Sequence, residues 1–326
     1  MPFYKNKALK ITCIVSLIMI CFVYHHYLNT DTKQIKFGTT YMTMNNTFYK
    51  AVNNEIENVV NNHGDVLYTR DPALDPKKQN EQIKDLVSLG IDVLIINPVE
   101  SSSINKTLKE VKKAGIKIIV VDAPISDDQI ADCTVVSDNY DAGVQCAKDM
   151  MQRFDHARIA LLEHSKALSA VDRINGFKDT VALNENYQIV GSEDCLGQTE
   201  LALPALNKII QQGIDFDVVF CLNDPTALGA LASIKENDLG HDVFIYGVDG
   251  SPEVKDLIKD GFIKKLLAET KAIVGTSSQS PTSLGKETIK VAYKMLHHKK
   301  YKRSIIVPTK LITKENIEEY DITGWQ

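Results

Sequence analysis

The sequence predicts an α/β protein with two lobes, each built on a parallel sheet covered by helices, and a cleft between the lobes. From residue 35 onward, short β-branched runs alternate with amphipathic segments of helical length, a pattern typical of right-handed β–α–β units. Runs such as VLII and IIVV are apolar throughout, as expected of strands that are buried on both faces. The alternation starts again near Arg158, and this restart indicates the second lobe.

The predicted strands number about ten, more than one sheet of this kind usually contains, which also favours two lobes. In chain order they are Ile35–Thr40, Asp65–Thr69, Val93–Asn97, Lys117–Asp122, Thr134–Ser137, Arg158–Glu163, Gln188–Glu193, Val218–Asn223, Val243–Asp249 and Lys264–Glu269. The helical patterns between them include Tyr49–His63, Lys77–Leu89, Ile104–Lys113, Ala142–Arg153, Ile174–Leu183 and Leu201–Gln211.

Polar residues end four of the apolar strands, at Asn97, Asp122, Asn223–Asp224 and Asp249. In open α/β sheets, ligands bind outside the carboxyl ends of the strands. Loops are often polar, so a single residue of this kind would carry little weight. Four of them together predict a cleft lined with hydrogen-bonding groups.

An apolar segment lies near the start of the chain. Residues 11–30 contain no Asp, Glu, Lys or Arg, and three lysines precede them. The strongly apolar part, Ile11–Tyr24, has 14 residues and reaches 18 when it is extended through Leu28. This length lies between a long signal-peptide core and a short membrane helix. The positive-inside rule places the N-terminus in the cytoplasm and the rest of the chain outside.

Signals for processing of this segment are weak. No small-x-small cleavage site follows it, and the residue before Cys21 is the bulky Ile20 instead of the small residue of a lipoprotein signal. We therefore expect residues 1–33 to be an uncleaved signal anchor that tethers an extracytoplasmic protein to the cell membrane. A cleaved signal peptide and an atypical lipoprotein are the alternatives.

Net charge and cysteine spacing argue against nucleic-acid binding and against a metal site. With 37 basic and 42 acidic side chains the net charge is −5, so the chain lacks the basic footprint that holds phosphate backbones, and we expect no nucleic-acid partner. Two of the six cysteines lie in the apolar segment, and the others, which show no CxxC spacing, are Cys133, Cys146, Cys195 and Cys221. We expect these four to be ordinary, partly buried thiols, and we predict no metal site.

Motifs for catalysis and cofactor binding are missing from the sequence. The chain has no GxSxG, HExxH or GxxxxGK[ST] motif, and GTTYMTMNN follows the first strand in place of GxGxxG, so we expect no catalytic residue and no cofactor. His164 has no candidate nucleophile at a motif position around it, so a solvated loop histidine is expected. Asp122 and Asp249 could form an acid/base pair, but two strand-end carboxylates suit ligand hydroxyls equally well.

Seven short motifs occur in an order that resembles one protein family. They are MNNTFYK at Met44–Lys50, INPVESSSI at Ile96–Ile104, VVDAP at Val120–Pro124, SDNYDAG at Ser137–Gly143, DRINGF at Asp172–Phe177, CLNDPTALGAL at Cys221–Leu231 and YGVDGSPE at Tyr246–Glu253. Together they resemble the type I periplasmic sugar-binding proteins, especially the ribose-binding branch, whose fold the LacI-type repressors share. The repressors carry an N-terminal helix-turn-helix where this chain has its apolar segment, so repressor function is set aside.

This resemblance, which extends from Ile35 to Ile312, implies two Rossmann-like lobes joined by three crossovers, with a sugar bound between them. It implies that 34–136 and 270–298 form the first lobe, and that 137–269 and 299–326 form the second. Carboxylates accept from sugar hydroxyls and an arginine donates to sugar oxygens; aromatic faces suit the C–H side of a sugar ring, although core packing is the alternative for the two aromatics. The implied ligand contacts are Asn46, Phe48, Tyr49, Asn97, Asp122, Arg173, Asn223 and Asp249.

Three departures from the ribose-binding pattern bear on the ligand. Ala123 follows Asp122 where the family has an arginine, and no Phe or Trp occurs at Leu196–Gln198. Glu269 stands where a glutamine is expected near the second crossover, so we expect it in the site as a further acceptor; contacts with backbone amides outside the pocket are the alternative. These changes argue against ribose and favour a different pentose, a polyol or a ligand with an amine.

The resemblance therefore implies an extracytoplasmic receptor that binds a sugar or polyol and delivers it to an ABC importer, whose permease is the expected partner. The alternative is a membrane-tethered sensor subunit that uses the same pocket and reports to a histidine kinase of a two-component system. An enzyme on the same fold is a third hypothesis, for which the sequence supplies no base.

Overall fold

The computed structural model describes residues 12, 14–21, 34–237, 239–265 and 272–326. The chain divides into two compact units, Met1–Ile35 and Lys36–Gln326. In the first unit residues 14–21 are helical, and most of the expected signal anchor lies outside the described residues. None of the helices described is long and apolar enough to cross a membrane.

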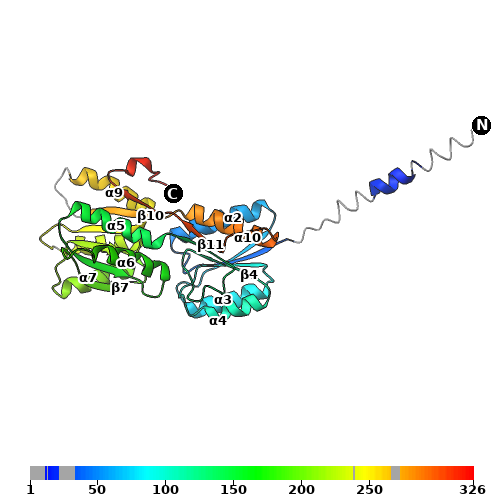
Figure 1. Ribbon diagram of the computed structural model, residues 1–326, viewed down its shortest axis with the longest axis horizontal. Helices are drawn as coiled ribbons and strands as arrows, with labels where there is room; N and C mark the ends of the chain where they lie inside the picture. The colour runs from blue at the N-terminus through cyan, green and yellow to red at the C-terminus, as the bar shows by residue number, and fades with distance from the viewer. Residues whose placement is uncertain (1–11, 13, 22–33, 238, 266–271) are drawn as a thin grey trace, which may run out of the picture. The chain divides into compact units, whose positions relative to one another are not determined.

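Two six-stranded sheets form the second unit, which confirms the predicted two-lobed α/β architecture (Figure 1). The first sheet is parallel throughout, in the order β11-β5-β4-β3-β1-β2. The second has the order β12-β10-β9-β8-β6-β7 and is parallel except where β12 runs antiparallel to β10. The strands are β1 Lys36–Thr40, β2 Val66–Arg70, β3 Val93–Ile96, β4 Lys117–Val121, β5 Cys133–Ser137, β6 Ala157–Glu163, β7 Tyr187–Asp194, β8 Val218–Cys221, β9 Phe244–Asp249, β10 Ala272–Ser278, β11 Ser304–Val307 and β12 Lys310–Thr313.

Helices cover both sheets. In the first lobe α2 packs on α10 at one face of the sheet, and α3 lies beside α4 at the other (Figure 1). In the second lobe α5 packs on α6, and α7 packs on α8. The helices are α2 Thr47–Asn62, α3 Pro76–Ser88, α4 Asn105–Lys113, α5 Asn139–Arg153, α6 Leu168–Val181, α7 Thr199–Gln211, α8 Asp224–Glu236, α9 Pro252–Lys265, α10 Pro281–Leu296 and the short 3₁₀ helix η1 Ile317–Glu319.

Local sequence explains where several of these elements begin. Asn46 and Asn223 cap α2 and α8, since their side chains accept from the second or third free amide of each helix, which would otherwise have no partner. Strands β3 and β8 are buried at every position, as their continuous apolar runs predict. Four cysteines expected to be partly buried are buried free thiols: Cys133, Cys146, Cys195 and Cys221.

The tenth predicted strand is misplaced. Lys264 and Lys265 end helix α9, and the strand forms at Ala272–Ser278 instead, between β9 and β12. The rest of the predicted strand, including Glu269, lies outside the described residues. A short apolar run such as the LLA that precedes Glu269 fits a helix or a strand equally well, and its periodicity cannot decide between them.

The expected lobe boundaries at 270 and 298 also need correction. Strand β10 pairs with β9 in the second sheet, and β11 pairs with β5 in the first. The chain therefore passes from the second lobe to the first after Ser278, and returns to the second after Val307. Helix α10, which lies between these two crossings, packs on α2 of the first lobe.

Candidate functional site

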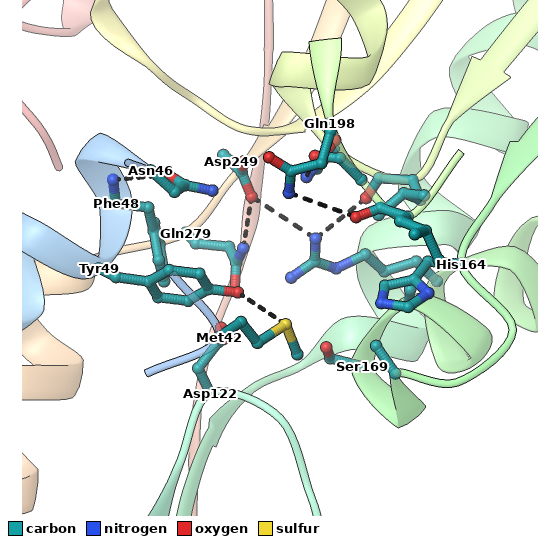
Figure 2. A pocket seen from close by; sticks show the side chains of 17 residues that line it. Met42, Asn46, Phe48, Tyr49, Asp122, His164, Ser169, Gln198, Asp249 and Gln279 are labelled. Atoms are coloured by element: carbon teal, nitrogen blue, oxygen red, sulfur yellow. Dashed lines mark hydrogen bonds and ion pairs between the residues drawn. The ribbon is translucent and has the colours of Figure 1, made fainter. Parts of the chain in front are cut away.

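A cavity lies where the carboxyl ends of strands from both lobes meet (Figure 2), and we call it the inner cavity. Seven of the predicted ligand residues line it: Asn46, Phe48, Tyr49, Asp122, Arg173, Asn223 and Asp249. The remaining lining residues, which sequence reasoning did not assign to the ligand, are Met42, His164, Ala167, Ser169, Ala170, Leu196, Gly197, Gln198, Leu222 and Gln279.

Asp122 follows strand β4 and is 3% exposed. Its Oδ2 accepts a hydrogen bond from Asn97 Nδ2 at 3.1 Å, whereas its Oδ1 has no partner among the residues described. Burial raises the pKa of this carboxyl from 3.8 to about 6, and Arg173 opposes the rise. In Asp122, Oδ2 is therefore bound by a protein donor, whereas Oδ1 can accept a hydrogen bond from a ligand.

Asp249 ends strand β9 and faces the same cavity. Its Oδ1 accepts from Gln279 Nε2 at 2.6 Å and lies 3.5 Å from Arg173 Nη1. Burial raises the pKa of this carboxyl above its ordinary value, whereas Arg173 lowers it. The arginine and the glutamine thus partly offset the cost of burying the carboxyl.

Arg173 is the only lysine or arginine among the described residues that line the cavity. Its Nε donates to Asn139 Oδ1 at 2.9 Å, and its Nη1 donates to the Leu222 carbonyl at 3.0 Å. The residue lies in the second turn of α6, because that helix begins at Leu168, six residues before the predicted start. The strand-end pattern therefore does not account for Arg173, which was expected at the ligand only from the family resemblance.

Close packing of α5 against α6 fixes the backbone around Arg173. A Cβ atom added at Gly143 in α5 would collide with the Arg173 carbonyl oxygen, and one added at Gly176 in α6 would collide with the Tyr140 carbonyl oxygen. Only glycine permits this approach at either position. The glycines of the SDNYDAG and DRINGF motifs thus set where the guanidinium enters the cavity.

Aromatic rings from the segment after β1 form one wall of the cavity. Phe48 is 3% exposed, and its ring meets that of Tyr49 edge to face, with centroids 5.7 Å apart. The Tyr49 ring in turn stacks on Tyr41 at 5.9 Å. The Tyr49 hydroxyl lies 3.5 Å from Met42 Sδ (Figure 2). The sequence left two interpretations open for Phe48 and Tyr49, ligand contact and core packing. The structure is compatible with both, because the two rings pack in an aromatic cluster and also line the cavity.

Asn97 does not line the cavity. It is fully buried; its Nδ2 donates to Asp122 Oδ2 at 3.1 Å, and its Oδ1 accepts from the Met42 amide at 3.1 Å. The structure thus places Asn97 behind the site, where it holds a carboxylate and the segment after β1. Its predicted contact with ligand stays a prediction, as does that of Glu269, which lies outside the described residues.

His164 and Gln279 are the most informative residues that the sequence reasoning did not assign to the site. His164 directly follows β6 and is 7% exposed, so the expectation of a solvated loop histidine is wrong. Its Nδ1 has no hydrogen bond among the described residues, and the nearest acid is Asp194, whose Oδ1 is 4.0 Å away. Burial lowers the pKa of this histidine. Gln279 directly follows β10. Both residues directly follow a strand, where ligands of open α/β sheets bind. The same strand-end pattern that indicated Asp122 and Asp249 could therefore have indicated them.

Three residues that line the inner cavity have strained backbone conformations. Asp122, Leu196 and Asp249 have φ angles of 67°, 52° and 141°, in regions that residues with a side chain rarely adopt. Such conformations cost about 1–3 kcal/mol each and persist where the surrounding structure enforces them, often at ligand clamps. Both carboxylates of the cavity are therefore held at positions that the fold enforces.

The chemistry of this set of side chains suits a neutral, hydroxyl-rich ligand. A hydroxyl both donates and accepts, and the cavity combines carboxyl and amide oxygens with guanidinium and amide N–H groups beside aromatic rings. Within the described ranges, no group of three or more His, Cys, Asp or Glu side chains is arranged to hold a metal ion.

Comparison with known proteins agrees with this geometry. A family model described as a periplasmic binding protein domain matches residues 37–300. The ribose import binding protein RbsB of Bacillus subtilis (strain 168) is 29% identical over 287 residues, which are 87% of this chain and 89% of that protein.

Two solved structures also resemble the chain. An ABC transporter solute binding protein from Mycobacterium smegmatis with bound glycerol has a TM-score of 0.81 and 28% identity, and the match covers 90% of this chain and 98% of that one. Another, from Bacillus halodurans C-125 with bound myo-inositol, has a TM-score of 0.81 and 21% identity, and covers 91% and 100%. At 21% identity, the likeness to the Bacillus halodurans protein shows that the two chains share a fold.

Proposed function

Because the chain belongs to the periplasmic binding protein family, among its type I sugar-binding members, we propose that it binds a neutral sugar or polyol in the inner cavity and delivers it to an ABC importer. The family implies an extracytoplasmic location and a binding role in place of catalysis.

One observation carries the proposal of a hydroxylated ligand. Two buried carboxyl groups, Asp122 from the first lobe and Asp249 from the second, face one cavity together with Arg173. Asp122 Oδ1 and Gln279 Oε1 have no partner among the described residues, so both can accept from hydroxyl groups. Hydrogen bonds that involve a charged group contribute about 1.5–3 kcal/mol each, and a ligand that bridges the two lobes stabilises their closed arrangement.

The same residues support a ligand other than ribose. Ala123, which occupies the position of the family's arginine, is 1% exposed, and the stretch Leu196-Gly197-Gln198 lines the cavity without an aromatic ring. The site therefore has one fewer cation and one fewer stacking face than the ribose-binding pattern. A polyol or another pentose depends less on both features, and a ligand with an ammonium group would gain from the two carboxyl groups.

Delivery to an importer is supported by the relatives, since one is named an import binding protein and the glycerol-bound structure is that of an ABC transporter solute binding protein. The sensor hypothesis depends on residues 1–33, most of which lie outside the described ranges, and no residue of the inner cavity favours it. We therefore propose the importer role alone.

A calorimetric and thermal-shift panel tests the proposed ligand class. Full-length protein is titrated with D-ribose, xylitol, myo-inositol, glycerol and glucosamine, because a ligand raises stability by RT ln(1 + [L]/Kd). We expect saturable binding of at least one polyol or pentose, with ribose not the tightest. If D-ribose, xylitol, myo-inositol and glycerol all fail to bind, the proposed class of neutral ligand is wrong, whether or not glucosamine binds.

A further inference from the structure

The single tryptophan of the chain, Trp325, lies against the ligand site from outside. Its ring meets that of Phe48 edge to face, with centroids 5.5 Å apart and an interplanar angle of 80°. Phe48 belongs to α2 of the first lobe and lines the inner cavity. Trp325 belongs to residues 320–326, which we call the C-terminal tail and which follow β12 of the second sheet and η1. This ring contact therefore connects the two lobes.

The C-terminal tail is fixed to the second lobe by a buried lysine. Lys255 in α9 is fully buried, and its Nζ donates to the carbonyl oxygens of Asp321 and Gly324, the latter at 2.6 Å. Lysine is almost never buried completely unless its charge is satisfied. Within the tail, Asp321 Oδ1 also accepts from the amide and hydroxyl of Thr323. These bonds hold the backbone directly before Trp325.

Trp325 also lines a second cavity beside the first, which we call the outer cavity. Asn46, Gln198 and Asp249 line both cavities, so the two share a wall made by residues of both lobes. The other residues of the outer cavity are Asn45, Thr47, Thr199, Glu200, Pro225, Leu228, Ser251 and Glu253. The half-buried indole thus lies where the lobes meet, next to the ligand residues.

Phe48 depends on its ring neighbours for its orientation. Tyr49 and Trp325 both meet its ring nearly at right angles, at 82° and 80°. Tyr49 keeps its place relative to Phe48 because both lie in the first turn of α2. Trp325, in contrast, belongs to the other lobe. Edge-to-face pairs are energetically favourable beyond the area that they bury, so the pair with Trp325 favours the arrangement in which the lobes meet.

We propose that Trp325 is a positioning residue for ligand binding, which sets the Phe48 ring against the ligand and holds the first lobe to the second while a sugar or polyol is bound. This inference rests on the proposed function. The contact forms when the lobes meet, so its loss acts mainly on the dissociation rate. We expect a three- to tenfold loss of affinity on removal of the indole, the range of one aromatic pair.

The test uses full-length protein titrated with xylitol, myo-inositol and D-ribose, with excitation of Trp325 at wavelengths that tyrosine does not absorb. We expect ligand to change the emission saturably, with the Kd that calorimetry gives. Trp325→Ala is expected to weaken binding three- to tenfold through faster dissociation, and Trp325→Phe to restore most of the loss. Tyr301→Ala, which removes a partly exposed ring that lines none of the cavities described above, is the matched control and is expected to leave affinity unchanged.

A double-mutant cycle separates a positioning role from general damage. If Trp325 acts through Phe48, then Trp325→Ala adds little to the loss caused by Phe48→Leu, and circular dichroism shows that all variants fold. Equal affinity and dissociation rate in wild type and Trp325→Ala, unchanged emission on saturation, or independent effects of the two substitutions would overturn the inference. Failure of wild-type protein to bind any neutral compound of the calorimetric panel overturns the proposed function instead, and with it the inference that rests on it.

Discussion

Arg173 Nη1 lies 3.5 Å from Asp249 Oδ1, and the two side chains are only 5% and 6% exposed. The guanidinium and the carboxyl meet at the inner cavity, between a helix and a strand end of the same lobe. Gln279, at the chain crossing toward the first lobe, binds the same Asp249 oxygen at 2.6 Å. Removal of one member would leave the others buried without their partner, which costs more than the pair itself contributes.

Asp249→Ala is therefore expected to weaken ligand binding at least tenfold, because a charge-assisted hydrogen bond to ligand is lost and about 1.4 kcal/mol corresponds to a decade in affinity. Isothermal titration with the best ligand of the panel measures the effect. The matched control is Asp256→Ala, the same change at an exposed position in α9, which is expected to leave the Kd unchanged. Equal affinity in both variants would remove Asp249 from the site.

Asp122→Asn is expected to stabilise the protein without added ligand while it weakens binding. The folded-state pKa of Asp122, about 6, exceeds its ordinary 3.8, so the native state holds the proton more tightly than the unfolded chain does. The wild-type unfolding free energy therefore falls as pH rises from about 4 to 6, and stays lower above that by about 2–3 kcal/mol.

Denaturant unfolding of wild type and Asp122→Asn at pH 4.5 and at pH 7.5 tests this. We expect the variant to be more stable than wild type at pH 7.5, and the difference to shrink at pH 4.5, where the wild-type carboxyl is protonated. If the difference between the two proteins is the same at both pH values, the Asp122 carboxyl is not buried in the protein without ligand.

Gly143→Ala is expected to destabilise the protein, although alanine normally favours a helix over glycine by about 1 kcal/mol. The added Cβ would collide with the Arg173 carbonyl oxygen, and such overpacking costs about 1–3 kcal/mol. The shift of α6 should also lower ligand affinity, because Arg173 moves with its backbone. Gln152→Ala, at an exposed position of the same helix, serves as control. A gain in stability for Gly143→Ala would mean that α5 and α6 are not in close contact.

The strand-end rule placed part of the candidate site from sequence alone, although Asn97 and Asp224, which obey the same rule, do not line the inner cavity. Asp122, Asn223 and Asp249 follow apolar runs whose strand character is unambiguous, and all three reach one cavity. Gln279 obeys the same rule, yet it was missed because the preceding strand was predicted eight residues too early at its start, at Lys264 instead of Ala272. Arg173 is in a helix, so only the resemblance of DRINGF to a family motif pointed to it.

The place of Trp325 beside the site could not be predicted from the local sequence. No periodicity or motif surrounds it, and its position depends on bonds from the distant Lys255 to the tail backbone. Exposure of a histidine is equally non-local: His164 follows a strand like the other site residues, but it is 7% exposed and lines a cavity to which both lobes contribute residues. Long-range packing, which decides burial, is therefore the part that sequence patterns leave open.

His164 is expected to contribute to ligand selectivity, since it lines the inner cavity and its Nδ1 has no hydrogen bond among the described residues. Burial lowers its pKa, so the ring is neutral at pH 7 and can both donate to and accept from a hydroxyl. His164→Leu should weaken the best ligand about tenfold, whereas His164→Gln should retain part of the affinity and change the order of preference among xylitol, myo-inositol and ribose. His156→Leu, the same change at an exposed position before β6, is the control. If His164→Leu leaves every Kd and the order of preference as in wild type, the histidine only packs against the cavity wall and the selectivity resides in the carboxyl groups.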